Sequence, residues 1–134
     1  MRTVYVGLQV TVPVMTVVIR KCYGMAGMGT TDKNGVDLKL AWPSAEWGSL
    51  PVEGGVAAAY RREIQSAPDP LRRQQEIEEE LRRYASPLLT AEAFAVEDVI
   101  DPRDTRHYLC RFLNAAQSRL KTSLGPKFKC GVRP

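Results

Sequence analysis

The chain has 134 residues, of which 44% are hydrophobic and 25% are charged, a length and balance that fit one globular domain and exclude a fibrous repeat or wholesale disorder. The formal net charge is +4, but the last sixteen residues hold five of the 19 basic residues and none of the 15 acidic ones. We interpret this basic end as a solvated terminal extension rather than a nucleic-acid or membrane contact, because no binding motif accompanies it.

The first apolar segment runs from Thr3 to Ile19. Gln9 and Pro13 interrupt it and valine dominates it, which favours a strand over a signal peptide or a membrane span. Within it, Val14 to Ile19 predicts a strand buried on both faces, as in the parallel sheets of α/β proteins. A glycine-rich segment, Tyr23 to Gly29, follows directly.

Two further strands and a helix are expected next. Leu38 to Trp42 and Ala45 to Leu50 are short apolar segments typical of strands. Pro51 is predicted to open a helix at its first position, and the alanine-rich residues 56 to 60 to continue it.

A long amphipathic helix is predicted to begin at Asp69, which can cap it, with Pro70 at the first helical position. Its opposite face is charged and therefore expected to be solvated. Its predicted apolar face is formed by Leu71, Ile77, Leu81, Tyr84 and Leu88.

The remaining elements are a short helix capped by Thr90 and reaching Phe94, an extended segment at 96 to 100, and a final helix. Asp101 followed by proline is expected to start that helix, and Gly125 with the next proline to end it. The apolar face predicted for it consists of Leu109, Phe112, Leu113, Ala116 and Leu120.

Conventional catalytic groups are scarce. His107 is the only histidine and is expected on the surface, while the consecutive acids at 78 to 80 point in different directions around a helix and form no acid/base pair. Cys22, Cys110 and Cys130 have no CxxC spacing, so we expect no metal site and reduced thiols in a cytoplasmic protein.

The glycine-rich segment is the strongest candidate for chemistry. A buried strand followed by such a turn and a helix can direct backbone N–H groups at one point, as in an oxyanion hole. The alternative is that the glycines only permit a tight turn from strand to helix.

Several ordered motifs resemble those of the biotin-dependent acyl-CoA carboxyltransferases, the β-subunit family of acetyl-, propionyl- and methylcrotonyl-CoA carboxylases. They extend over about residues 5 to 121, which makes them more specific together than any one alone. The matching segments are Val12–Gly24, Leu40–Glu46, Glu53–Val56, Tyr60–Ile64, Tyr84–Pro87 and Val99–Arg106.

The resemblance implies a truncated crotonase-like fold, an α/β spiral of ββα units with amphipathic C-terminal helices, at residues 1–121, followed by a basic tail at 122–134. It implies that the backbone amides of Met25 and Ala26 hold the ureido oxygen of biotin, with Tyr23, Gly24 and Gly27 shaping the loop. Carboxybiotin, delivered by a biotin carboxyl carrier protein, would release CO2, take the α-proton of an acyl-CoA and so allow the enolate to capture the CO2.

Two substitutions and the length depart from the family pattern. Met25 stands where most relatives have glycine, although methylcrotonyl-type sequences are similar here, and Pro51 replaces another glycine. A full subunit of this kind has two crotonase-like domains, so the acyl-CoA half of the site is expected to come from a complementary N-terminal domain on another chain, within a homo-oligomer. The alternatives are a noncatalytic oligomerising relative and a subunit of a biotin-dependent acyl-CoA decarboxylase.

Overall fold

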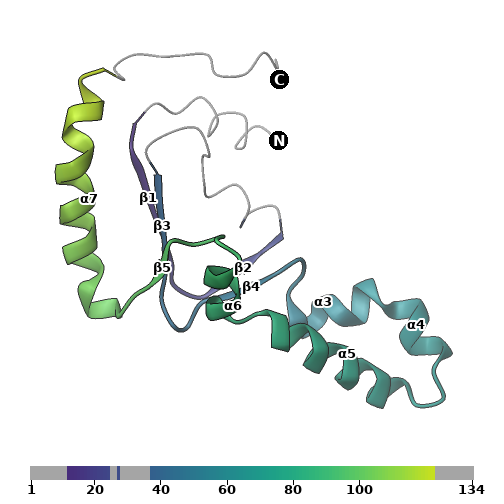
Figure 1. Cartoon of the computed structure of the whole chain (residues 1–134). Coiled ribbons are helices and arrows are strands. Elements are labelled where there is room, and N and C mark those ends of the chain that lie inside the picture. The colour runs from purple at the N-terminus through teal and green to yellow at the C-terminus, as the bar shows by residue number, and fades with distance from the viewer. Residues whose placement is uncertain (1–11, 25–26, 28–36, 123–134) are drawn as a thin grey trace, which may run out of the picture.

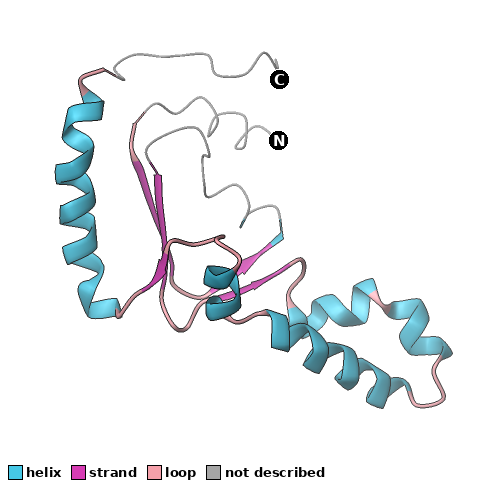
Figure 2. Cartoon of the chain, in the orientation of Figure 1, coloured by secondary structure: helices cyan, strands magenta, loops and turns pink. Residues whose placement is uncertain are grey.

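The computed structural model describes residues 12–24, 27 and 37–122. Within them, parallel strands form two small sheets, flanked by helices (Figures 1 and 2). The three-stranded sheet has the order β1 (Val14–Val18), β3 (Asp37–Ala41), β5 (Asp98–Val99). The second sheet pairs β2 (Lys21–Tyr23) with β4 (Glu46–Gly48). All three strands expected between residues 14 and 50 are thereby confirmed as β1, β3 and β4.

The β1–β2 segment and the β3–β4 segment each contribute one strand to each sheet. β1 leads into β2, β3 leads into β4, and the two segments pair in register, with Val14 opposite Asp37 and Lys21 opposite Glu46. The connections between the strands also pair, because the Trp42 amide donates to the Val18 carbonyl at 2.9 Å and the Ser44 hydroxyl donates to the Ile19 carbonyl at 2.6 Å. Two ββ units therefore lie side by side with their carboxyl ends at a common edge.

The prediction that the first strand is buried on both faces is wrong. Val18 is the one buried residue of β1, and the other four are half-buried. β1 is an edge strand of the described sheet, with a paired strand on one side only. The fully buried residues Leu40 and Ala41 belong instead to the central strand, β3.

A helical unit with its own core projects from the sheets (Figure 1). It consists of α3 (Val52–Ala59), α4 (Arg61–Ser66) and α5 (Pro70–Tyr84). Its core consists of Val52, Val56, Ile64 and Ile77 with Leu50, Tyr60 and Leu81 against them. Pro51 is the residue before α3 rather than its first helical position, and non-helical backbone at Glu53 and Gly54 kinks the helix near its start.

The start of α5 is as predicted, but its apolar face is only partly so. The Asp69 side chain accepts a hydrogen bond from the Arg72 amide at 3.1 Å, which caps the helix. Ile77 is buried and Leu81 half-buried, whereas Leu71 is 76% exposed and Tyr84 is also exposed. Leu71 lies six residues before Ile77, which at 3.6 residues per turn places it about 120° around the helix from Ile77.

Two corrections concern the C-terminal helices. Ser86, not Thr90, caps the short helix α6 (Pro87–Glu92), and Phe94 lies beyond its end. Asp101 caps the 3-10 turn η1 (Pro102–Asp104), after which α7 (Thr105–Leu120) begins.

The inward face of α7 is narrower than predicted. Ala116 is buried and Phe112 and Leu120 are half-buried, whereas Leu109 and Leu113 are exposed. The expected stop at Gly125 and Pro126 lies outside the described residues.

Candidate active site at the end of β2

The glycine-rich segment begins where β2 ends. Gly24 has a φ of +61°, a left-handed conformation that favours glycine, and a Cβ there would lie 3.4 Å from the Ser49 carbonyl oxygen. Gly27 is buried, and a Cβ there would lie only 2.7 Å from the Cys22 sulfur. Both glycines are thus required by the backbone path and by close packing. Met25 and Ala26 lie outside the described residues.

Tyr23, the last residue of β2, is held by β4. Its phenol donates a hydrogen bond to a carboxylate oxygen of Glu46 at 2.9 Å. Its ring lies across Gly48, where a Cβ would be 3.0 Å from the nearest ring carbon. Burial, then the hydrogen bond to Glu46, raises the pKa of Tyr23 to about 12, so the phenol keeps its proton at neutral pH.

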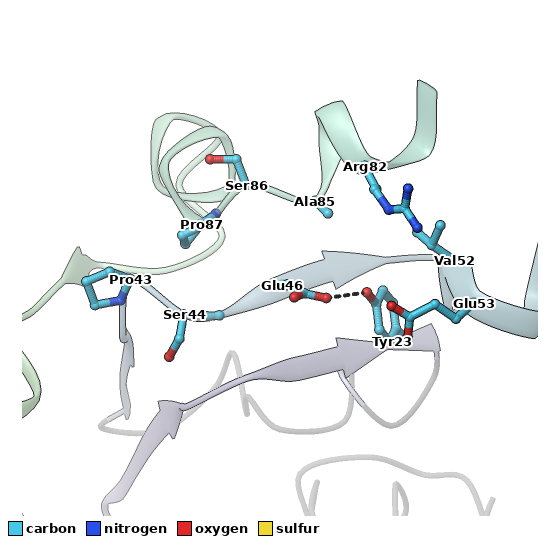
Figure 3. Close-up of a pocket in the computed structure, with 11 residues that line it drawn as sticks. Tyr23, Pro43, Ser44, Glu46, Val52, Glu53, Arg82, Ala85, Ser86 and Pro87 are labelled. Atoms are coloured by element: carbon cyan, nitrogen blue, oxygen red, sulfur yellow. Dashed lines mark hydrogen bonds between the residues drawn. The ribbon is translucent and has the colours of Figure 1, made fainter. Parts of the chain in front are cut away.

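A pocket of about 380 Å³ opens beside this pair (Figure 3). It is formed where the ends of β2 and α5 meet the starts of β4, α3 and α6, and Figure 3 shows Tyr23 and Glu46 joined beneath Arg82. Its walls combine apolar and polar side chains, which are Tyr23, Pro43, Ser44, Ala45, Glu46, Val52, Glu53, Arg82, Ala85, Ser86 and Pro87.

The charged groups of the pocket are partly neutralised by neighbours. Lys21 and Glu53 form an ion pair at 2.7 Å, and the hydrogen bond from Lys21 lowers the pKa of Glu53. Arg82 lies 3.5 Å from Glu78 on the preceding turn of α5. The Lys21–Glu53 pair is substantially exposed, so it contributes little to stability.

The other candidates from the sequence that the structure describes do not line the pocket. His107 is exposed on α7 and lies edge-on to Tyr108, far along the chain from the pocket. Cys22 and Cys110 are free thiols, and Cys130 lies outside the described residues. Within the described part of the chain, no group of three His, Cys, Asp or Glu side chains could hold a metal ion, and no helix there is long and apolar enough to cross a membrane.

The Tyr23–Glu46 pair and the pocket were not predicted from the sequence. The two residues are 23 positions apart, and only the pairing of Tyr23 with Gly48 brings Glu46 within reach diagonally across the strands. A signal did exist, since both residues belong to the segments that resemble the carboxyltransferases.

The chain belongs to the carboxyl transferase domain family, which it matches over residues 3–130. It is 39% identical over 123 residues to the carboxyltransferase subunit of propionyl-CoA carboxylase from Haloferax mediterranei, covering 90% of this chain and 24% of that one. It is 36% identical over 123 residues to the methylmalonyl-CoA carboxyltransferase 12S subunit from Propionibacterium freudenreichii subsp. shermanii, an alignment that again covers 90% of this chain and 24% of that one. The chain therefore spans about a quarter of the length of these relatives.

Solved structures agree with this assignment. The transcarboxylase 12S structure, a hexamer with methylmalonyl-coenzyme A bound, superposes with a TM-score of 0.74 at 34% identity, covering 99% of this chain and 26% of that one. The β subunit of geranyl-CoA carboxylase from P. aeruginosa superposes with a TM-score of 0.76 over 98% and 26% of the two chains, and at 17% identity it shows the fold alone. The predicted α/β class and the family resemblance are both confirmed.

Proposed function

We propose that this chain is the biotin-facing part of an acyl-CoA carboxyltransferase, acting in the cytoplasm on carboxybiotin presented by a biotin carboxyl carrier protein. Its strand pairs form part of a crotonase-like ββα spiral at residues 1–121, with a basic tail at 122–134. A complementary N-terminal domain on another chain, within a homo-oligomer, supplies the acyl-CoA half of the site. The observation that carries the proposal is the left-handed Gly24 at the end of β2, beside a pocket, in a chain of this family.

The donor set after β2 suits the ureido oxygen of biotin. Residues 24–27 read Gly-Met-Ala-Gly, so this segment offers peptide N–H groups and no ionisable side chain. Backbone donors are already oriented and need no proton transfer, which is the requirement for holding an oxygen on which negative charge develops. In this proposal the amides of Met25 and Ala26 hold that oxygen, and Tyr23, Gly24 and Gly27 shape the loop.

The bound cofactor would supply the carboxyl group and then accept the α-proton of the acyl-CoA. The protein's own part is to bind the ureido group, orient it and stabilise its charge. In this scheme the protein needs no side-chain base. This is consistent with a chain whose one histidine is exposed and lies away from the pocket.

Binding of biotin by the full chain tests the proposal. Calorimetric titration with a biotinylated carrier domain should show saturable binding, with the unbiotinylated carrier as control. Ala26→Pro removes one N–H donor and should weaken binding by about tenfold, the equivalent of one hydrogen bond, whereas Ala26→Gly keeps the donor and should stay within about twofold. Equal affinities for the two variants, or no binding by the unmodified chain, would overturn it. A chain that self-associates without binding biotin would be the noncatalytic relative instead.

A decarboxylase subunit is the second candidate. The chain is 32% identical over 120 residues to the α subunit of methylmalonyl-CoA decarboxylase from Propionigenium modestum, covering 88% of this chain and 23% of that one. Both readings use the same biotin loop, with carboxyl transfer in opposite directions. Transfer of the carboxyl group from methylmalonyl-CoA to biotin, with release of propionyl-CoA, is the same reversible step in both cases. Net decarboxylation of methylmalonyl-CoA that requires a membrane partner separates a decarboxylase component from a carboxylase component.

A further inference from the structure

We propose that the Tyr23–Glu46 hydrogen bond is a positioning device, which fixes the end of β2 and thereby the direction in which the chain enters the turn at Gly24. Neither side chain is required to touch a substrate. The consequence for biotin rests on the proposed function, whereas the positioning itself can be measured without any ligand.

The first support is the way β4 accommodates the tyrosine ring. Tyr23 pairs with Gly48 across the two parallel strands, and a side chain at position 48 would meet the ring at 3.0 and 3.1 Å. Gly48 therefore provides the slot in which the ring lies. From this slot the hydroxyl reaches Glu46, two residues earlier on the same face of β4.

The second support is that Tyr23 is held in place directly before Gly24. Tyr23 immediately precedes Gly24, whose φ of +61° is a left-handed conformation that favours glycine. Two contacts fix the Tyr23 side chain just before this residue, namely the ring on Gly48 and the phenol on Glu46. A residue held at both its backbone and its side-chain end transmits that orientation to the next peptide.

The third support is that the phenol remains a donor over the whole neutral range. Burial and the Glu46 carboxylate both raise the pKa of Tyr23, Glu53 raises it further, and Arg82 opposes them only weakly. The pair is thus not a switch at neutral pH. It is a fixed contact in the lining of the pocket.

Hydrogen–deuterium exchange of the loop amides tests the proposal. In the full chain without ligand, Tyr23→Phe should accelerate exchange at Gly24 and Gly27, the described residues of the loop, about fivefold, as expected for loss of one hydrogen bond, while α7 amides keep their rate. Tyr108→Phe is the matched control. It removes a phenol that donates to Asp98 at 3.0 Å on an exposed surface, and it should leave the loop unchanged.

Changes at Glu46 provide an independent approach. Glu46→Leu should accelerate loop exchange as Tyr23→Phe does, and Glu46→Gln, which keeps an oxygen acceptor, should restore most of the protection. Loop exchange at the unmodified rate in Tyr23→Phe or Glu46→Leu would overturn the proposal. So would acceleration of equal size in α7, which would show general destabilisation.

Biotin titration of the same variants adds the functional result. If the loop binds biotin, Tyr23→Phe should weaken binding by a similar factor of about five. If the unmodified chain binds no biotin, the proposed function fails, yet the exchange measurement still decides whether Tyr23 positions the loop.

Discussion

A methyl group at Gly27 should destabilise the chain through a single identifiable contact. The added Cβ would lie 2.7 Å from the Cys22 sulfur, whereas the atoms after that, the Cys22 carbonyl carbon and oxygen, are 3.4 Å away. Optimal contacts between nonbonded carbon atoms are about 3.5 to 4.0 Å, so the overlap approaches 1 Å. Overpacking of this kind costs about 1 to 3 kcal/mol, which we expect for Gly27→Ala.

The double variant isolates that contact. Cys22→Ala removes the sulfur and leaves only the two 3.4 Å neighbours, so Gly27→Ala should cost less than about 1 kcal/mol in the Cys22→Ala background. Chemical denaturation of the four chains, with the unfolding free energy taken from each, measures the difference. An identical cost of Gly27→Ala in both backgrounds would refute the reasoning, because the sulfur would then not be the obstacle.

Three other predictions concern different parts of the chain. Leu40→Ala should lower the unfolding free energy by about 2 to 5 kcal/mol, because Leu40 has no exposed surface, whereas the same change at the exposed Leu71 should stay within about 0.5 kcal/mol. Phe94→Gly should raise the melting temperature, with a gain of up to about 1 kcal/mol, because Phe94 has a φ of 55° and a side chain that is 94% exposed; a lower melting temperature would contradict this. Alkaline titration of phenolate absorbance should assign a pKa near 12 to the tyrosine lost in Tyr23→Phe. Since the folded pKa lies above the ordinary 10.0, the stability that this contributes is present below pH 10 and falls as the pH rises towards 12, and a Tyr23 that titrates at its ordinary pKa would contradict the burial described.

The Phe94 prediction follows from the way α6 ends. The Phe94 amide donates to the Ala91 carbonyl and the Ala95 amide donates to the Thr90 carbonyl, a pair of hydrogen bonds typical of a helix end with glycine in the left-handed position. Phenylalanine occupies that position here. From the sequence we expected a helix that reaches Phe94, whereas α6 ends at Glu92.

The boundaries that could be predicted from the sequence are those set by contacts within a few residues. Asp69 caps α5 through an amide three positions away, and Asp101 caps η1 through an amide two positions away. The apolar segments that became β1, β3 and β4 were also recognisable. The exposure of each residue in these strands could not be predicted, since it depends on which neighbour covers each face. For the same reason the exposure of Leu71 and Leu113 on their helices could not be predicted.

The sequence by itself determined the family, through motifs whose order and spacing survive in this quarter-length chain, and it determined the elements whose caps and apolar patterns are local. Only the tertiary structure decided that Tyr23 meets Glu46, that Gly48 receives its ring, and that Arg82 and Ser86 complete the same pocket. These residues come from separate elements. Their proximity follows from strand register and from the packing of α5 and α6 against the sheet ends, which no short stretch of sequence specifies.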